Sequence, residues 1–274
     1  MTWGSNVPLT RTPDAHFLTE VRYKGTKVVS VSPDYAESTT SSDAWLNVKA
    51  GTDAALAMAM GHVILKEYYI DKETPYFKEY AKEFTDMPFL VRVEDINGTV
   101  QPGRFLNAKD LGRQEEGADF QMVLIDELTN EIVVPNGTMG ERHTNPQKWN
   151  LRLENRDTGA KIDPRLSVFD QREDVTVVKL PYFGDEEHEG IIERAIPTIT
   201  VQTVDGPVKV TTVYDLILAN YGIDRGIGGE VAKAYTDDTP YTPTWQEKIT
   251  GVKAEIAIAT AREFADNAEK TKGR

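Results

Sequence analysis

The sequence predicts a mixed α/β fold that starts as three layers, a parallel sheet between helices, and continues with a β-rich insertion and a helical return. Three observations lead to this prediction. Short β-branched runs alternate with helical patterns over residues 1–86, which is typical of a parallel sheet. Strand-like runs separated by hairpin dipeptides fill 87–212, and helical periodicity returns over 213–274. We therefore expect these three parts: a cofactor-binding part, an insertion and a return segment.

The first part has a regular alternation of helix and strand signals. Pro13 stands at a favoured first helical position and Gly25 offers a stop. The helix that Gly51-Thr52-Asp53 introduces is apolar nearly all round and is predicted to be buried, with Thr52 as its cap. The predicted helices are 13–23, 53–68 and 75–84, the last with its aromatic residues on its inner side, and the predicted strands are 27–31 and 45–48.

The insertion and the return segment differ in their patterns. Asn97-Gly98, Asn136-Gly137 and Asp205-Gly206 are dipeptides typical of hairpin turns. The predicted strands of the insertion are 89–94, 120–126, 131–135, 175–180 and 198–204, with loops at 142–165 and 184–190. The predicted helices of the return segment are 213–221, 244–250 and 253–268.

Composition excludes several classes of function. Lys plus Arg is 31 against 44 for Asp plus Glu, a net charge of −13, which repels nucleic-acid backbones. The chain has no cysteine, so it cannot itself supply a disulfide, a cysteine-ligated metal or a thiol nucleophile. We expect a cytoplasmic protein without direct membrane insertion, because the start lacks an apolar signal region and the apolar stretch 54–65 is too short to span a bilayer.

No catalytic or metal-binding motif stands out. The four histidines are far apart, and His62 on an apolar helix is typical of a core residue. The acidic run 185–189 suits a solvated loop better than a cation site. Neither a nucleophile-elbow pattern nor a phosphate-binding Walker loop is present. We therefore assign no catalytic residue and no metal ligand.

Small and polar residues stand at three places: before the first predicted helix, at the end of the strand 27–31, and at the start of the predicted buried helix. In an open α/β sheet, ligands bind at the carboxyl ends of the strands and against helix N-termini. Small residues there allow close backbone approach to a phosphate or sugar, and carboxylates can accept hydrogen bonds from a ribose or a guanine edge. The candidate residues are Ser5, Asn6, Ser32, Asp34, Gly51, Thr52 and Asp53. Ordinary turn and capping chemistry remains an alternative, since no Gly-x-Gly-x-x-Gly is present.

Several long runs resemble one family. The chain reads Trp-Gly-Ser-Asn-Val-Pro-Leu-Thr-Arg-Thr-Pro-Asp-Ala-His-Phe at 3–17 and Ser-Pro-Asp-Tyr-Ala-Glu at 32–37. Ala-Gly-Thr-Asp-Ala-Ala-Leu-Ala-Met-Ala-Met-Gly-His-Val follows at 50–63, and Val-Thr-Thr-Val-Tyr-Asp-Leu-Ile-Leu-Ala-Asn-Tyr-Gly at 210–222. These runs resemble the alpha, catalytic subunits of membrane-bound respiratory nitrate reductases, which are molybdopterin oxidoreductases.

The resemblance implies a cofactor and partners. Such a subunit holds molybdenum between two molybdopterin guanine dinucleotides, has an iron–sulfur cluster, and reduces nitrate to nitrite by oxygen-atom transfer in anaerobic respiration. Its partners are an iron–sulfur beta subunit and a membrane cytochrome b gamma subunit at the inner face of the cell membrane. By resemblance, Ser5 and Asn6 lie near the phosphates or sugar, Ser32 and Asp34 near the ribose, and Gly51, Thr52 and Asp53 near the guanine.

Departures from the family pattern limit what is carried over. The family's cluster needs cysteines, which this chain lacks, and its molybdenum-binding aspartate precedes the motif at 3–6. We therefore expect an internal segment of a larger subunit, Rossmann-like at its start, that depends on the subunit's other regions and is inactive alone. A stand-alone nucleotide- or partner-binding α/β module and a related molybdenum reductase of chlorate or selenate are the alternatives.

Overall fold

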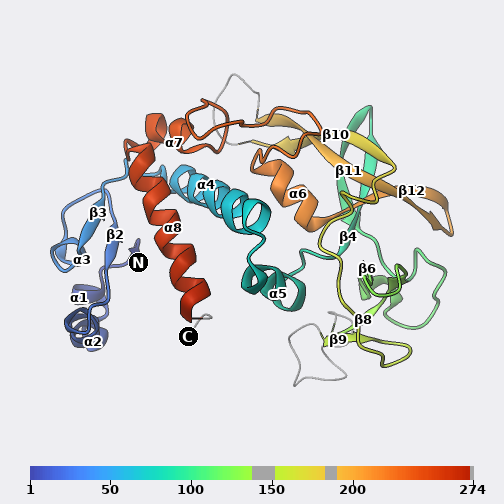
Figure 1. Cartoon of the computed structure of the whole chain (residues 1–274), viewed down its shortest axis with the longest axis horizontal. Coiled ribbons are helices and arrows are strands. Elements are labelled where there is room, and N and C mark those ends of the chain that lie inside the picture. The colour runs from blue at the N-terminus through green and yellow to red at the C-terminus, as the bar shows by residue number, and fades with distance from the viewer. Residues whose placement is uncertain (138–151, 183–189, 272–274) are drawn as a thin grey trace. The chain divides into compact units, whose positions relative to one another are not determined.

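The computed structural model describes residues 1–137, 152–182 and 190–271 (Figure 1). The chain forms two compact units, residues 1–64 with 234–267 and residues 65–233 with 268–274. The fold class is confirmed: a parallel sheet, an antiparallel sheet and helices occur in one chain. The three-part division at residues 86 and 212 stays a prediction.

A three-stranded parallel sheet organises the first unit. Its strands are β1 (Thr2–Trp3), β2 (Val29–Val31) and β3 (Ala44–Leu46), in the order β1-β2-β3. The central strand β2 pairs in parallel with both neighbours, so that Trp3 lies beside Val31 and Val31 beside Leu46. All three strands therefore end at the same edge of the sheet.

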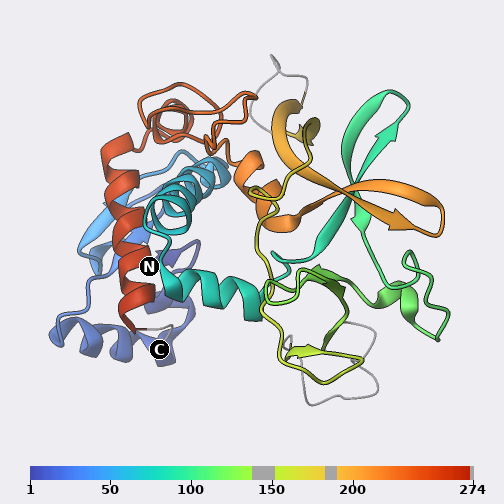
Figure 2. The same ribbon diagram turned by 45° about the vertical axis from the view of Figure 1, so that its right-hand side comes forward.

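Long helices cover one face of this sheet. These are α4 (Asp53–Ile64) and α8 (Ala254–Thr271), which lie beside one another in Figure 2, while α7 (Pro243–Thr250) packs against α4. Their core joins Val29, Val31 and Leu46 of the sheet to Leu56, Met60 and Val63 of α4 and to Ala257 and Ala261 of α8. The predicted burial of α4 holds for this side of the helix, whereas Ala54 and Ala57 remain exposed.

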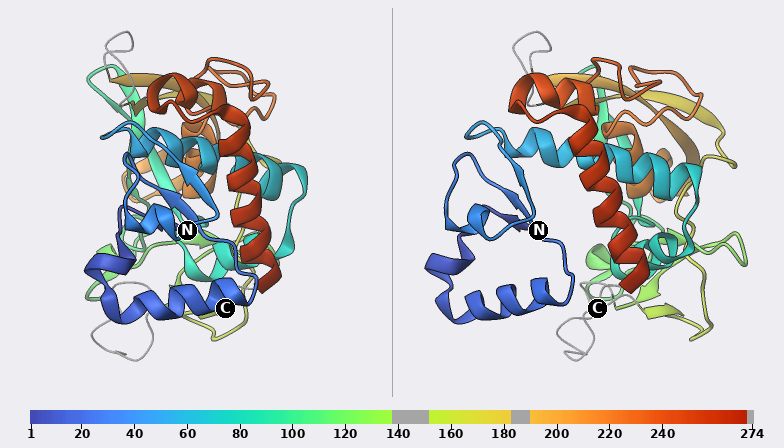
Figure 3. Two further views of the ribbon diagram at one scale, coloured as in Figure 1. Left: turned by 90° about the vertical axis from the view of Figure 1, so that its left-hand side faces the viewer. Right: turned by 60° about the vertical axis from the view of Figure 1, so that its left-hand side comes forward.

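Other helices lie on the opposite side of the first unit. Helix α3 (Glu37–Thr40) covers Ser30 of β2, whose hydroxyl lies 3.4 Å from that of Thr39. Helices α1 (Val7–Thr10) and α2 (Thr12–Tyr23) contain no buried residue, and Figure 3 shows them at the margin of this unit. The predicted helix 13–23 is thus present, but it does not pack into the core.

Two helical segments begin the second unit. The expected single helix 53–68 is wrong at its end, because the helix widens after Ile64 into the π-helical segment η1 (Leu65–Asp71). Helix α5 (Pro75–Phe84) has the predicted bounds. The expectation that its aromatic residues all point inward is wrong: Tyr80 is 47% exposed and Phe84 46%.

A five-stranded antiparallel sheet forms most of the predicted β-rich part. Its order is β10-β11-β12-β4-β5, and it curls across the right of Figure 1. The strands are β4 (Leu90–Ile96), β5 (Thr99–Phe105), β10 (Asp174–Pro181), β11 (Ile191–Thr203) and β12 (Gly206–Thr212). The Asn97-Gly98 hairpin is confirmed, since both residues have positive φ, +55° and +79°, as a two-residue turn requires.

Short elements complete the second unit. They are η2 (Ala118–Phe120), β6 (Leu124–Ile125), β7 (Ile132–Val133), β8 (Pro135–Asn136), β9 (Arg152–Asn155) and α6 (Val213–Asn220). The predicted strand 120–126 is wrong over most of its length, since only Leu124–Ile125 form a strand. Its first residue, Phe120, belongs instead to the 3₁₀ turn that follows Gly117 at φ +80°. The strand β9 lies in the predicted loop 142–165. The acidic run 185–189 lies outside the described residues.

Across the ranges that the structure describes, no helix combines the length and the apolarity needed to cross a bilayer.

The first-unit core yields a stability prediction. Leu56 is fully buried between the sheet and α8, so Leu56→Ala should lower the free energy of unfolding by about 3 kcal/mol through lost burial and a cavity. Leu9→Ala is the control: Leu9 is 62% exposed, and the expected loss is below about 0.5 kcal/mol. Urea denaturation measures both, and equal losses would contradict this core.

Candidate functional site

The predicted site residues all follow the carboxyl ends of the three parallel strands. Ser5 and Asn6 follow β1, Ser32 and Asp34 follow the central strand β2, and Gly51 to Asp53 follow β3. Because the strands are parallel, these three loops lie along one edge of the sheet. Residues nearly fifty positions apart in the sequence therefore belong to one surface.

One hydrogen bond joins the first of these loops to the last. The indole Nε1–H of Trp3 donates to Oδ1 of Asp53 at 2.7 Å. Trp3 also packs against the core of the unit, so the carboxylate is tied to a fixed ring. Asp53 is exposed and stands in the first turn of α4, where the helix dipole favours a negative charge. A carboxylate accepts about four hydrogen bonds, so most of its acceptor capacity remains available.

Asn6 has one satisfied and one unsatisfied end. Its Nδ2 donates to Oε2 of Glu37 at 2.8 Å, while its Oδ1 is buried without a hydrogen-bond partner. Buried polar atoms are nearly always paired, and an unpaired one requires an explanation. The Asn6 hydrogen bond, with a second from the backbone of Glu37, lowers the pKa of the Glu37 carboxyl. The neighbouring Ser5 is exposed.

The loop after β2 is held by local contacts. The Ser32 hydroxyl donates to Oδ1 of Asp34 at 2.9 Å, and the Trp45 indole donates to the Ser32 carbonyl at 2.9 Å. The Tyr35 ring meets Trp45 edge-on at 5.4 Å between centroids. One oxygen of Asp34 is thus engaged, and the other can accept from a ligand.

Glycines at two of the loops keep the edge open. Gly4 has φ +63° and Gly51 φ +81°, a left-handed conformation that favours glycine. Apart from the glycine itself and its two chain neighbours, no described atom lies within 4 Å of the position that a Cβ would take at either residue. The expected cap of α4 by Thr52 is not seen; its hydroxyl donates to the carbonyl of Lys49 at 2.6 Å.

Sequence reasoning missed the residues that hold the candidate residues in place. These are Trp3 for Asp53, Glu37 for Asn6 and Trp45 for Ser32. Trp3 directly precedes the Gly-Ser-Asn motif, which was the available signal. Glu37 and Trp45 carry no local signal, because their partners lie in other elements.

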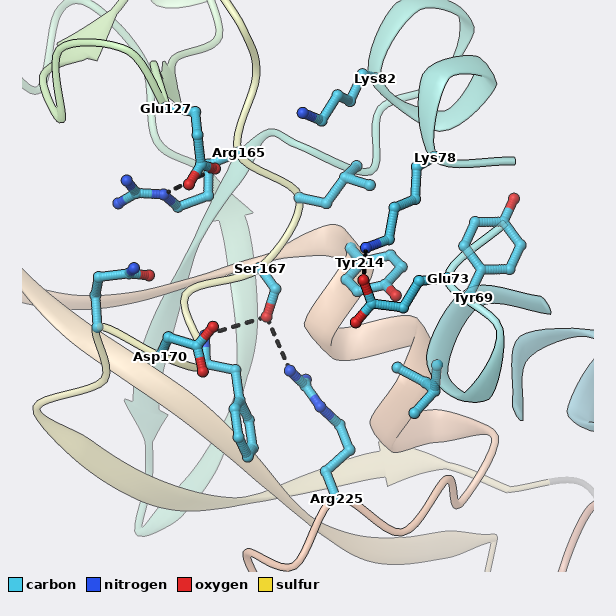
Figure 4. A pocket seen from close by; sticks show the side chains of 14 residues that line it. Tyr69, Glu73, Lys78, Lys82, Glu127, Arg165, Ser167, Asp170, Tyr214 and Arg225 are labelled. Carbon is cyan, nitrogen blue, oxygen red and sulfur yellow. Dashed lines mark hydrogen bonds and ion pairs between the residues drawn. The ribbon is translucent and has the colours of Figure 1, made fainter. Parts of the chain in front are cut away.

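The second unit contains a cavity of about 560 Å³ whose lining lysines and arginines are paired with carboxylates (Figure 4). Four cations face it, and each has a carboxylate: Lys78 with Glu73, Lys82 with Asp163, Arg165 with Glu127, and Arg225 with Asp215. Burial raises the pKa of Tyr69 to about 12 and that of Tyr214 further, so both stay neutral hydroxyls. Paired cations give little net attraction for an anion, so this cavity is a weaker candidate than the sheet edge.

Asp215 organises one wall of this cavity. It is fully buried and accepts from the Ser167 hydroxyl at 2.6 Å, the Val168 backbone at 2.9 Å and Arg225 at 2.5 Å. It also forms a reciprocal cap with Thr212 at the start of α6. The network is fully satisfied, which is typical of a structural role.

The described ranges contain no cluster of three or more histidine, aspartate or glutamate side chains that could hold a metal ion.

Comparison with known proteins decides the family. Residues 1–261 match the molybdopterin oxidoreductase family. The chain belongs to this family. Its members use a molybdenum–pterin cofactor, and the polar groups at the sheet edge, which are carboxylate and amide oxygens and hydroxyls, suit the organic part of such a cofactor.

Individual relatives agree with the resemblance seen in the sequence. The chain is 52% identical over its whole length to the nitrate reductase alpha chain of Bacillus subtilis, and covers 22% of that protein. It is 47% identical over 99% of its length to the respiratory nitrate reductase 1 alpha chain of Escherichia coli, covering 23% of it. The chlorate reductase alpha subunit of Ideonella dechloratans is 36% identical over 96% of the chain, which covers 21% of that subunit. This molybdopterin oxidoreductase chain thus spans under a quarter of these three relatives.

Asn6 gives a pH-dependent prediction. Asn6→Ala removes the main hydrogen bond that lowers the Glu37 pKa, so this pKa should rise toward 4.5. A depressed folded-state pKa stabilises the fold above the unfolded pKa, and this stabilisation is lost as pH falls through the folded value. NMR titration of the Glu37 carboxyl carbon measures the shift, with Leu9→Ala as the control, because Leu9 is exposed on the short helix α1 that Asn6 precedes. An unchanged Glu37 titration in Asn6→Ala would contradict the contact.

Asp215 gives a stability prediction. Asp215→Asn leaves Arg225 without its buried counter-charge and should cost about 3–5 kcal/mol of unfolding free energy. Asp170→Asn is the matched control, because Asp170 lines the same cavity but is exposed; its expected effect is within about 0.5 kcal/mol. Chemical denaturation of both variants decides, and a cost at Asp215 no larger than at Asp170 would refute the role.

Proposed function

We propose that this chain is part of the catalytic alpha chain of a molybdenum-dependent respiratory nitrate reductase, and that its parallel-sheet edge holds the nucleotide end of a molybdopterin guanine dinucleotide. Nitrate is favoured over chlorate as the substrate of the whole enzyme, because identity is 52% and 47% to two nitrate reductase alpha chains and 36% to a chlorate reductase. The observation that carries the cradle is the hydrogen bond between Trp3 and Asp53 across the strand ends.

Asp53 is assigned to the guanine base. A guanine presents two adjacent donors, N1–H and its amino group, which match the two oxygens of a carboxylate. The Trp3 indole donates to one oxygen of the carboxylate and fixes its plane, and the other acceptor positions stay available to the base. Gly51 and Thr52 flank this residue, and the open space at Gly51 allows the base to approach the backbone.

The other loops suit the sugar and the phosphates. The buried, unpaired Oδ1 of Asn6 is an acceptor and fits a sugar hydroxyl. The Ser5 hydroxyl, exposed beside Gly4, can donate to a phosphate oxygen. Asp34 has one oxygen held by Ser32 and can accept a ribose hydroxyl with the other. These roles give each loop one portion of the dinucleotide.

The remaining parts of the proposal concern the whole enzyme. When bound, the molybdenum cofactor supplies oxygen-atom transfer, and the protein binds and orients it. We propose electron supply from an iron–sulfur beta subunit and a membrane cytochrome b gamma subunit, and a position at the inner face of the cell membrane. This chain by itself should show no viologen-linked nitrate reduction.

Nucleotide binding tests the cradle. We expect GDP to bind the purified chain more tightly than ADP, because adenine presents an acceptor at N1 where the Asp53 carboxylate needs a donor. Asp53→Asn should raise the Kd for GDP roughly tenfold to hundredfold by loss of a charge-assisted pair. Isothermal titration calorimetry measures both effects.

The matched control is Glu255→Gln. Glu255 is an exposed acid in the first turn of α8, so this variant also removes a negative charge from the first turn of a helix, but at a residue outside the predicted site. Its Kd for GDP should equal that of the unsubstituted chain. Equal weakening in both variants, or equal affinity for GDP and ADP, would refute guanine recognition by Asp53.

A further inference from the structure

Helix α5 carries an exposed row of aromatic rings. Tyr76, Tyr80 and Phe84 follow one another at four-residue spacing, which places them on one side of the helix. Neighbouring rings lie close together: the ring centroids of Tyr76 and Tyr80 are 6.3 Å apart, and those of Tyr80 and Phe84 are 5.2 Å apart. Tyr80 and Phe84 are both nearly half exposed. We call these three residues the aromatic row.

The other sides of α5 are fixed to the second unit. Ala81 is fully buried, and the Phe77 ring packs against Tyr68 and Tyr69 at 5.5 Å from each centroid. Lys78 pairs with Glu73 at 2.6 Å and Lys82 with Asp163 at 2.6 Å. Because these contacts set the rotation of the helix, the aromatic row cannot turn inward without breaking them.

Acidic residues border the aromatic row. Glu79 and Glu83 lie one turn apart on the side of the row away from Phe77 and Ala81. In the part of the chain that the structure describes, neither carboxylate has an ion-pair or hydrogen-bond partner. A surface of this kind complements a segment that presents apolar side chains beside lysine or arginine, and an arginine can also lie over a tyrosine ring.

We propose that the aromatic row, with Glu79 and Glu83, is the docking surface for a basic, apolar segment of the same alpha chain that lies outside these 274 residues. Charge complementarity defines the segment. We place this segment in the same polypeptide because the chain covers only 22% and 23% of the two nitrate reductase alpha chains, so that most of an alpha chain of that length lies outside it. Contiguous exposed aromatic side chains are typical of protein interfaces. The proposal does not depend on the nucleotide cradle.

Tyrosine labelling tests the docking surface. The protein is an alpha chain of the relatives' length that carries this stretch, without cofactor and without other subunits. Nitration with tetranitromethane followed by mass spectrometry gives the reactivity of Tyr80, with this 274-residue chain as reference. We expect Tyr80 to be reactive in the reference and several-fold less reactive in the long chain. Tyr23, which is 87% exposed on α2, is the internal standard for the activity of the reagent in the two samples, the long alpha chain and the 274-residue chain.

Two outcomes would overturn the proposal. Undiminished reactivity of Tyr80 in the long alpha chain and in the assembled enzyme means that nothing docks there. Protection only in the assembled enzyme means that another subunit covers the row. As a second test, Glu83→Lys in the long chain should restore Tyr80 reactivity, whereas Glu20→Lys, a charge reversal on the exposed helix α2, should not. If neither variant restores the reactivity of Tyr80, the docked segment is not held by the charge of Glu83, and the proposal of a basic segment is wrong.

Discussion

The parallel pairing of β2 with both of its neighbours is the constraint on which the candidate site depends. It places the ends of β1, β2 and β3 at one edge, and it thereby brings Asn6, Asp34 and Asp53 from three separate loops to one surface. The buried side of the sheet, through Val31 and Leu46, holds α4 in position, and α4 in turn presents Asp53 at its first turn. The core and the site are therefore parts of the same arrangement.

Carboxylates have two different uses in this chain. Asp215 is buried and accepts hydrogen bonds from a hydroxyl, a backbone N–H and a guanidinium, so its carboxylate stabilises the second unit. Asp53 is exposed and has one donor from Trp3, so its charge is held in place and remains available to a ligand. The two carboxylates therefore differ in how many of their acceptor positions are already occupied.

The sequence predicted what local chemistry determines. Asn97-Gly98 predicted a hairpin because few other dipeptides accept two positive φ angles, and the short apolar runs predicted the parallel strands β2 and β3, whereas β1 carried no strand signal. It failed where tertiary contacts decide. The partners Trp3–Asp53 and Asn6–Glu37 join separate elements, and the outward position of Tyr80 follows from ion pairs on the opposite side of α5. The placement of the candidate residues along one edge was predictable from the strand–helix alternation, whereas the residues that fix them were not.

An experimental structure of an alpha chain that carries this stretch, with its molybdenum cofactor bound, would show which group Asp53 contacts. We expect the Asp53 carboxylate to lie at about 2.7–3.2 Å from N1 and the amino nitrogen of a guanine, while Trp3 Nε1 keeps its hydrogen bond to the same carboxylate. A guanine bound elsewhere, with Asp53 in contact only with Trp3 and solvent, would contradict it.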